Sequence, residues 1–149
     1  MTGAKQNPDL VVVGAGIVGL GRAAELARDV LATEPGRQLA LRELLWAELS
    51  AGIPGLVRIS PPDGCLPNTL MVAVPDRIGS DVLDAVEGVA ASTGSACHSG
   101  VHTPAETLLA MGVAPELALG ALRLSLGRST SADDVRAAAA AIGAAWART

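Results

Sequence analysis

The sequence contains no phenylalanine and no tyrosine, which limits the kind of core that it can build. Half of its 149 residues are hydrophobic, but the aromatic ones are only Trp46 and Trp146. Leucine, valine, isoleucine and alanine must therefore fill the interior, and each buries less apolar area than an aromatic side chain. A chain of this length is sufficient for one domain with its own core. We expect a compact, alanine-rich domain with some apolar surface for a partner.

Charge and cysteine content exclude several classes of function. The net charge is −4, Lys5 is the only lysine and the arginines are scattered, which argues against a nucleic-acid partner. The uncharged run over residues 10–21 is too short to span a bilayer and does not resemble a signal peptide, so we expect a cytoplasmic protein that does not bind membranes. Neither Cys65 nor Cys97 has the spacing of a metal site.

The pattern of polar and apolar residues predicts a small α/β layer. Thr103–Glu106 is predicted to be a capping box with Pro104 at the first helical position, and Ser131 is predicted to cap the last helix. The sequence Glu34-Pro35-Gly36 is predicted to end the first helix and to separate it from the second. Helices are predicted over 17–32, 38–49, 80–87, 103–112 and from 131 onward, and strands over 10–13, 56–59, 70–74, 89–91 and 121–126.

A glycine motif near the N-terminus has the form of a dinucleotide-binding loop. Gly14, Gly16 and Gly19 follow an apolar run in the spacing G-x-G-x-x-G, which is typical of FAD- or NAD-binding proteins. Such a fold also needs a second strand that ends in an acid about 20 residues on. The first suitable acid is Glu43, which lies in a stretch with helical periodicity. We favour a glycine-rich entry to a packed helix, and a flavin or nicotinamide module remains the alternative.

A run of small and polar residues surrounds one cysteine. Residues 92–100 read Ser-Thr-Gly-Ser-Ala-Cys-His-Ser-Gly, a composition that favours an exposed loop. A thiol is activated by nearby positive charge, which His98 would supply to Cys97. Free cysteines also commonly serve as inert, buried small residues, and the segment alone does not distinguish the two cases.

Three segments in this order resemble the C-terminal domain of the NifS-like cysteine desulfurases. They are Leu-Pro-Asn-Thr-Leu at 66–70, the cysteine segment at 92–99, and Leu-Arg-Leu-Ser-Leu-Gly-Arg-Ser-Thr at 122–130. Residues 17–26 are similar to the family helix that leads into this domain. His98 and the run 121–130 look closest to the selenocysteine lyase branch. The resemblance covers roughly residues 16–146.

The resemblance implies a fold and a division of the chain. The fold would be the small C-terminal α/β domain of a fold-type I pyridoxal-phosphate enzyme (class V aminotransferase fold), with a small mixed sheet and helices packed on it. Residues 1–15 would be an irregular tail or short strand, and residues 16–149 the connecting helix and the small domain. The large domain that carries the cofactor lysine would be absent.

The resemblance also implies a role for three residues. Cys97 matches the cysteine that attacks the substrate sulfur and carries it as a persulfide, and His98 would tune this thiol. Arg123 matches the arginine that binds the α-carboxylate, because a guanidinium makes two parallel bonds that lysine does not. The substrate would be L-cysteine or L-selenocysteine, and the product L-alanine. Family members are homodimers that pass sulfur to an acceptor protein, for iron–sulfur clusters among other uses.

The chain departs from the family where the cofactor is held. The family lysine lies in a Ser-x-His-Lys-like segment that has no counterpart here, and Lys5 lies in a polar tail. We therefore expect that this chain does not bind pyridoxal phosphate covalently and is inactive in isolation. A cofactor-free sulfur-relay domain that uses only Cys97 is a third hypothesis. We expect Cys65 to be a bystander, although a disulfide with Cys97 would prevent the chemistry, and His102 to be a loop residue.

Overall fold

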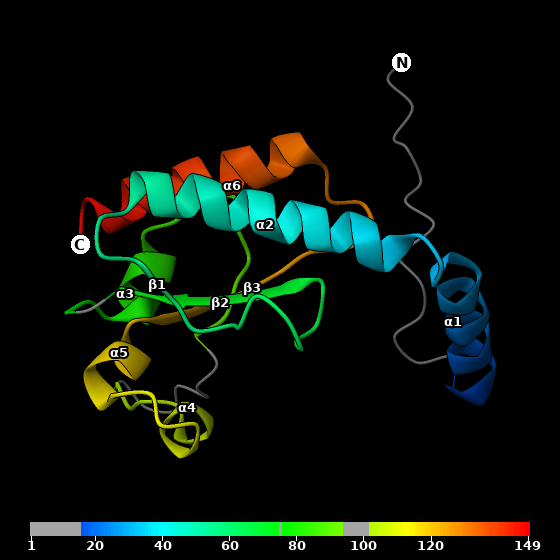
Figure 1. Cartoon of the computed structure of the whole chain (residues 1–149), viewed down its shortest axis with the longest axis horizontal. Coiled ribbons are helices and arrows are strands. Elements are labelled where there is room, and N and C mark those ends of the chain that lie inside the picture. Colours follow the sequence, from blue (N-terminus) through cyan, green and yellow to red (C-terminus); the bar gives the residue numbers. More distant parts are fainter. Residues whose placement is uncertain (1–15, 75, 94–101) are drawn as a thin grey trace. The chain divides into compact units, whose positions relative to one another are not determined.

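The computed structural model describes residues 16–74, 76–93 and 102–149, with side chains from Gly21 onward. These residues fall into two compact units, 1–35 and 36–149, each of which is described by itself. Helix α1 (Gly16–Val30) belongs to the first unit (Figure 1). It confirms the predicted helix over 17–32, and an ion pair of 3.1 Å joins Arg22 and Glu25 on its exposed surface. The predicted strand 10–13 lies outside the described residues.

Helix α2 (Glu34–Gly52) is longer than the sequence indicates. Pro35 and Gly36 lie in its first turn, so the predicted interruption at 34–36 is wrong. Proline is compatible with this position because the N–H groups of a first turn have no acceptor within the helix. The buried residues Leu41, Leu45 and Leu49 recur every four positions and form one apolar face.

The larger unit contains an antiparallel sheet of three strands in the order β1-β2-β3. The strands are β1 (Val57–Arg58), β2 (Thr69–Ala73) and β3 (Ala121–Ser125), and Met71 pairs with Arg123 in the centre of β2–β3. The predicted strands at 56–59, 70–74 and 121–126 are therefore confirmed. All pairings among the described strands are antiparallel, so the expected mixed sheet is wrong in strand direction while the small α/β fold is confirmed.

The two faces of the sheet are covered by different helices (Figure 1). Helices α2 and α6 (Ala132–Trp146) lie on one face, and α4 (Glu106–Ala110) and α5 (Pro115–Leu119) on the other. Successive strand residues point to opposite faces, so β3 contributes Leu122 and Leu124 to the first interface and Ala121 to the second. Helix α3 (Gly79–Asp84) adds Val82 to the first interface.

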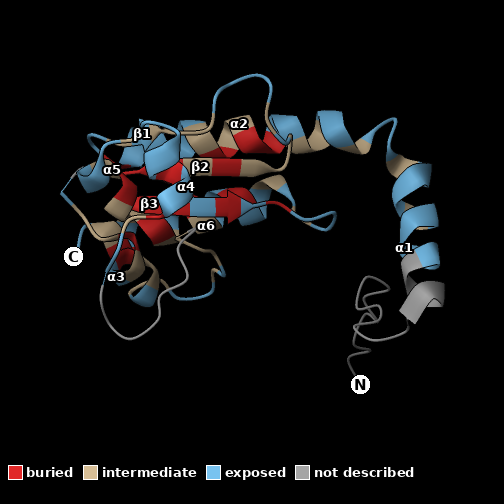
Figure 2. Ribbon diagram, turned by 90° about the horizontal axis from the view of Figure 1, so that it is seen from below, coloured by how far each residue is buried: buried red, intermediate tan, exposed pale blue. Residues whose placement is uncertain are grey.

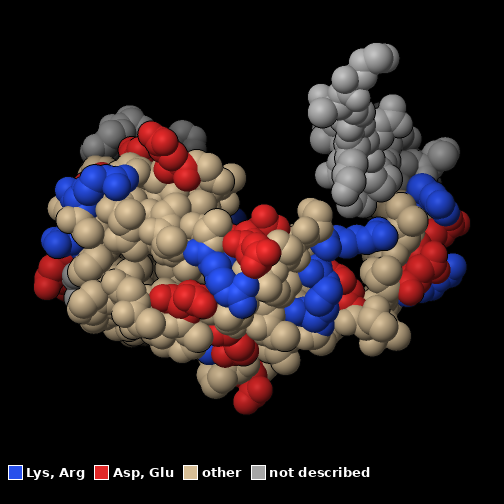
Figure 3. All heavy atoms as spheres, turned by 90° about the horizontal axis from the view of Figure 1, so that it is seen from above, with Lys and Arg blue, Asp and Glu red and all other residues tan. Residues whose placement is uncertain are grey.

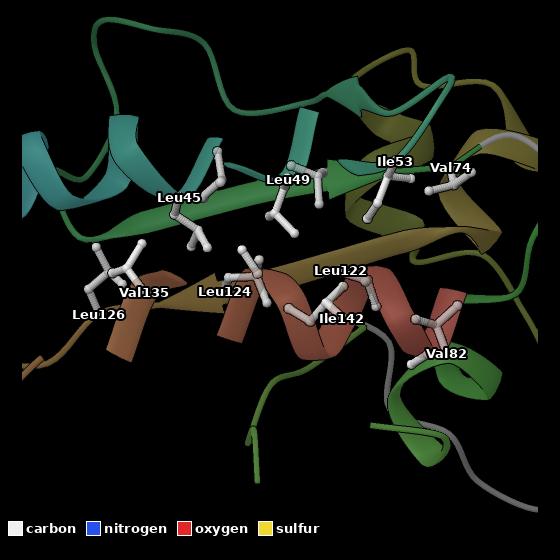
Figure 4. Close-up of a cluster of buried hydrophobic side chains, with 14 of the residues drawn as sticks. Leu45, Leu49, Ile53, Val74, Val82, Leu122, Leu124, Leu126, Val135 and Ile142 are labelled. Atoms are coloured by element: carbon white, nitrogen blue, oxygen red, sulfur yellow. The ribbon is translucent and has the colours of Figure 1, made fainter. Parts of the chain in front are cut away.

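Branched aliphatic residues and alanine form the core, as the absence of Phe and Tyr requires. Burial is concentrated in β2, β3 and the helix faces that contact them, and α1 is exposed (Figure 2). Figure 4 shows how side chains from α2, β3 and α6 interdigitate. Both tryptophans are only partly buried at the margin of this cluster. The main buried members are Leu45, Leu49, Ile53, Leu70, Val72, Leu122, Leu124, Val135 and Ile142.

The two predicted helix caps have opposite outcomes. Ser131 forms the expected capping box, in which its hydroxyl accepts from Asp134 N at 3.2 Å and its own N–H donates to Asp134 Oδ2 at 2.9 Å. The capping box at Thr103 is wrong, because α4 is capped by Ala105 without a side-chain hydrogen bond. Ala105 follows Pro104 in an extended conformation, so the helix does not begin until Glu106.

Smaller differences concern short elements. The predicted helix 80–87 is confirmed as α3, although it ends at Asp84. Residues 89–91 do not form the predicted strand, and Ser92 alone makes a bridge to Arg123. Sequence analysis did not predict α5, which has Pro115 as its first residue.

Two glycines allow close backbone contact at the end of the sheet. A Cβ atom on Gly120 would overlap the carbonyl oxygen of Val74, and one on Gly79 would lie 2.5 Å from the carbonyl oxygen of Ala121. These positions fix the turn from α5 into β3 and the start of α3. Because backbone atoms oppose both positions, a larger side chain would require the strand itself to move.

We therefore predict that Gly120→Ala lowers the free energy of unfolding by about 2 kcal/mol, the usual cost of overpacking. Urea denaturation measures this change. Gly143→Ala is the matched control in α6, where the nearest atom to a new Cβ is Ile53 Cγ1 at 4.0 Å. It should be neutral or stabilising by about 0.5 kcal/mol, because alanine favours a helix. Equal stability of the two variants would contradict this description of the turn.

Candidate functional site

Arg123 lies at the centre of β3 and is exposed. Its neighbours Leu122 and Leu124 point into the core, so the strand alternation directs Arg123 to the opposite face. Helices α4 and α5 cover that face around Ala73 and Ala121, and the cover does not extend to Arg123. The strand thus presents a cation beside a small apolar cluster.

The guanidinium of Arg123 has no hydrogen bond or ion pair to any residue that the structure describes. Only its backbone takes part in the interactions of the sheet. A guanidinium with free N–H groups matches the two oxygens of a carboxylate. The role of Arg123 as the α-carboxylate ligand stays a prediction.

The chain that leads to the cysteine is attached to β3 at Arg123 itself. Arg123 N donates to the carbonyl oxygen of Ser92 at 2.6 Å, and Ser92 N donates to the carbonyl oxygen of Arg123 at 3.2 Å. Residues opposite each other in an antiparallel pair direct their side chains to the same face. The side chains of Ser92 and Arg123 therefore lie on the same face of the sheet. This is the face that α4 and α5 cover only in part, and it is called the open face below.

The chain that follows the cysteine segment returns to the same region. His102 Nδ1 lies 3.0 Å from Ser80 Oγ, and His102 Nε2 lies 3.8 Å from Asp81 Oδ1. Thr93 and His102 line one small cavity together with Ile78, Ser80, Thr103, Ala118 and Leu119. The ends that bracket residues 94–101 are thus adjacent. Cys97 and His98 lie outside the described residues, so their predicted roles stay predictions.

Cys65 is a free cysteine that has hydrogen-bond partners in its turn. Its Sγ accepts from Arg42 Nη1 at 2.9 Å and donates to the carbonyl oxygen of Pro61 at 3.1 Å. The expectation that Cys65 is a bystander did not anticipate this contact. Cys65 therefore helps to hold the turn, because its sulfur bonds both to the buried guanidinium of Arg42 and to the turn backbone at Pro61.

Arg42 is the one buried charged residue among the described residues, with 1% of its surface exposed. Besides Cys65, its guanidinium donates to the carbonyl oxygens of Pro62 at 2.6 Å and Leu66 at 3.0 Å. It also donates twice to Glu43 Oε1. These bonds satisfy the buried charge and hold the turn that leads into β2.

Glu43 connects Arg42 to a second arginine. Arg58 donates to both of its carboxylate oxygens at 2.7 Å, and this bond is the main reason why the pKa of Glu43 falls from 4.5 to about 2. Arg58 also stacks on Trp46, with its guanidinium carbon 5.6 Å from the ring centre. Glu43 was the nearest candidate for a ribose-binding acid, and the structure instead places it in a helix, bound by two arginines.

A third arginine, Arg37 at the start of α2, holds the turn after β3. Arg37 donates to the carbonyl oxygens of Gly127 at 3.2 Å, Arg128 at 2.8 Å and Thr130 at 2.6 Å. Sequence analysis missed this contact and the Arg42 cluster. Backbone carbonyl acceptors leave no trace in a sequence, although an arginine beside Leu41 on an apolar face was a usable signal for burial.

Other kinds of site find no support in the described part of the chain. It contains no group of three or more potential metal ligands. None of its helices has the length and apolar character needed to cross a membrane. Basic and acidic side chains are intermixed on the face that Figure 3 shows. Gly14 of the glycine motif lies outside the described residues.

Comparison with known proteins identifies relatives of this chain. The chain is 42% identical over 120 residues to the cysteine desulfurase IscS of Anaeromyxobacter sp. strain Fw109-5 and 37% identical over 123 residues to the cysteine desulfurase NifS of Azotobacter vinelandii. The chain is homologous to the C-terminal part of NifS-like cysteine desulfurases. No protein-family model matches it.

Solved structures agree with this relationship to the NifS-like proteins. One NifS-like protein superposes with a TM-score of 0.76 at 29% identity, over 90% of this chain and 34% of its own. A NifS-like protein from Rickettsia africae has a TM-score of 0.74 at 24% identity, over 87% of this chain and 33% of its own, and supports the fold alone.

The match to the Anaeromyxobacter IscS covers 80% of this chain and 30% of that protein. The match to the Azotobacter NifS covers 81% of this chain and 31% of that protein. The chain therefore spans about a third of the length of the NifS-like relatives. Cysteine desulfurases depend in general on pyridoxal phosphate. The residues described here do not fit its covalent attachment, because Lys5 is the only lysine and lies outside them.

We predict that Glu43→Gln destabilises the protein by about 1 kcal/mol at neutral pH, a value that allows for solvent screening of this partly exposed carboxylate. The pKa of Glu43 is lower in the fold than its ordinary value of 4.5, so its ion pairs stabilise fully above that pH. This contribution is lost as the pH falls toward 2, where the carboxylate is protonated in both states.

Urea denaturation at neutral pH and at about pH 3 measures this effect, and the difference from the parent should shrink at the lower pH. Glu48→Gln is the matched control on the same helix, since Glu48 makes only an exposed contact of 3.8 Å with Arg136. A pH-independent difference for Glu43→Gln would show that its charge does not stabilise the turn.

Proposed function

We propose that this chain supplies the sulfur-accepting part of a pyridoxal-phosphate-dependent cysteine desulfurase. In this proposal Arg123 binds the substrate carboxylate and Cys97 accepts the sulfur. The main support is the pair of backbone hydrogen bonds between Ser92 and Arg123, because it joins the start of the cysteine segment to the proposed carboxylate ligand. The homology to IscS and NifS supports the type of reaction.

Arg123 would fix the amino acid by its carboxylate end. A planar guanidinium donates to both carboxylate oxygens at once, which sets the orientation of the bound molecule as well as its position. A charged hydrogen bond is stronger where water is partly excluded. The apolar cluster around Ala73 and Ala121 adjoins the site on the same face and would exclude part of the water. A lysine at the same place would provide charge but no fixed orientation.

Cys97 would act as the sulfur acceptor. It is four positions after Thr93 in the sequence, so its backbone lies within about 14 Å of that residue. In the transfer, the Cys97 thiolate forms a bond to the substrate sulfur, and the bond between that sulfur and the substrate Cβ breaks. The electron pair of the broken bond remains on Cβ, which takes up a proton and leaves as alanine. His98 would favour the thiolate by its charge.

The cofactor would be held by a lysine-bearing domain outside the residues described here, and pyridoxal phosphate supplies the electron sink that makes the substrate Cβ–sulfur bond labile. The large domain or a dimer partner would complete the site. An acceptor protein would then take the persulfide from Cys97. Selenocysteine fits the same arrangement, because Arg123 would bind a carboxylate that the two substrates share.

A cofactor-free sulfur relay is the second candidate. It is favoured by one feature of the chain, namely that its single lysine lies far in sequence from the cysteine segment and outside the structure described. In a relay, Cys97 would accept persulfide sulfur from another protein and pass it on. This activity needs the thiol but neither Arg123 nor an amino-acid substrate.

We predict that the purified 149-residue chain takes up ³⁵S from a persulfidated donor protein and that Cys97→Ser abolishes the uptake. Cys65→Ser is the matched control and should retain it, because Arg42 and Pro61 already engage that sulfur. The same chain with added pyridoxal phosphate should release no alanine from cysteine. Labelling of Cys65 in place of Cys97 would contradict the proposed acceptor, and alanine release would contradict the need for a second domain.

The role of Arg123 can be tested in a chimera that joins this chain to the lysine-bearing part of the Azotobacter vinelandii NifS. We predict that Arg123→Lys raises the KM for cysteine about 30-fold, since hydrogen bonds to charged groups carry much of the binding energy. Arg136→Lys is a control on the exposed side of α6 and should leave KM unchanged. An unchanged KM in Arg123→Lys would remove Arg123 from the site.

A further inference from the structure

A partly open cleft lies at the edge of the sheet, beside the C-terminal end of β3. Its volume is about 210 Å³, and it is bounded by residues 88–90, by the end of β3 and by α6. An engineered cavity of about 150 Å³ lined by aliphatic residues binds benzene, so this space is sufficient for a group of about one ring. The floor of the cleft is apolar and consists of side chains that Figure 4 labels, namely Leu45, Leu124, Leu126, Val135 and Ile142.

The cleft exists because strand pairing at this edge stops after a single bridge. Ser92 pairs with Arg123 in the antiparallel sense, so continued pairing would place Ala90 opposite Ser125. No backbone hydrogen bond joins Ala90 to Ser125, and both residues line the cleft. Gly88 has a φ of 77°, a left-handed conformation that favours glycine, and it turns the chain just before Ala90.

Small side chains leave the space between these segments unfilled. Gly88, Ala90 and Ala138 all line the cleft, and none of them reaches far from its own backbone. The sequence contains no Phe or Tyr that could occupy the space instead. A compact apolar group from a ligand therefore has room to lie against the floor.

The main chain of Ser125 provides a hydrogen-bond donor and an acceptor at the cleft. The backbone N–H and C=O groups of Arg123 point away from β2 toward Ser92, and the alternation of an antiparallel strand directs those of Ser125 to the same side. No residue that the structure describes bonds to either backbone group of Ser125. A ligand in the cleft thus meets a free N–H group and a free carbonyl oxygen.

Asp134 is the only charged residue among the described residues that line the cleft. The N–H and the hydroxyl of Ser131 donate to Asp134 Oδ2 at 2.9 and 2.7 Å, and these bonds lower the pKa of Asp134, so the carboxylate is charged at neutral pH. Its Oδ1 has no partner within the described part of the chain. Arg37 bonds to the carbonyl oxygen of Thr130 but does not line the cleft. A charged acceptor beside an apolar floor favours a cationic donor.

We propose that this cleft binds a small primary amine that carries a compact apolar group of about one ring. The apolar group lies on the floor, and the ammonium group donates to Asp134 and to the carbonyl oxygen of Ser125. An ammonium group has three N–H donors, so it bonds to both acceptors at once. The floor includes Leu124 and Leu126, whereas Arg123 points to the open face, so this site is separate from the proposed carboxylate ligand and does not rest on the proposed function.

The test is an NMR titration of the whole 149-residue chain with 2-phenylethylamine, followed through the backbone amide resonances. We expect saturable shifts at Ser125, Leu126 and Asp134, with a dissociation constant on the order of 1 mM for a ligand of this size. The neutral analogue 2-phenylethanol should bind about tenfold more weakly, because hydrogen bonds to charged groups are the stronger ones. Phenylacetate, which Asp134 repels, and methylamine, which lacks the apolar group, should produce no saturable shifts. Equal affinity for 2-phenylethanol would contradict the choice of an amine.

Three variants separate binding in the cleft from binding elsewhere. Ala138→Leu fills the cleft from α6 and should abolish the saturable shifts, whereas Ala140→Leu, at an exposed position of the same helix, should preserve them. Asp134→Asn removes the charge and keeps an amide oxygen that accepts from the Ser131 N–H, so the helix cap remains and the affinity should fall about tenfold. The absence of saturable shifts in the parent, or equal binding by the parent, Ala138→Leu and Asp134→Asn, would overturn the proposal.

Discussion

The antiparallel pairing of β2 with β3 determines the rest of the structure. It sets Met71 opposite Arg123, and the alternation along β3 then divides the strand between two environments. Leu122 and Leu124 enter the core beneath α2 and α6, while Arg123 reaches the open face. A shift of the register by one residue would bury the guanidinium and expose both leucines. The burial of the leucines thus holds the proposed carboxylate ligand in place, so the core and the site depend on the same strand.

Arginines on α2 and β1 hold the turns next to the sheet. The sequence contains no Phe or Tyr, so large apolar side chains that could pack against the turns are few. Arg42 holds the turn before β2 and Arg37 holds the turn after β3, in each case through backbone carbonyl oxygens. Glu43 balances the charge of Arg42 and Arg58. These contacts support β2 and β3 at their ends.

The sequence predicted those parts of the fold that depend on local pattern. Apolar spacing located the helices and the strands of the sheet, and the serine–aspartate pair located the cap at Ser131. It failed where a proline was compatible with two structures, as at Pro35 in a first helical turn and at Pro104 before an extended residue. It also failed where the partner is a backbone atom, as for Arg37, or is far away in the chain, as for His102 and Ser80. Family resemblance predicted Cys97 and Arg123 as site residues, and both roles stay predictions. The strand register explains why Arg123 is exposed.

The central proposal is that the cysteine segment presents its thiol on the face of the sheet that carries Arg123. Paramagnetic relaxation enhancement tests it most directly, with a nitroxide on Cys97 and the backbone amide resonances of the chain as reporters. The account predicts broadening of the amides of Arg123, Ser92 and His102, with those of Glu48 and Ala140 on the outer sides of α2 and α6 unaffected. Broadening centred on α2 and α6, with the Arg123 amide unchanged, would contradict it.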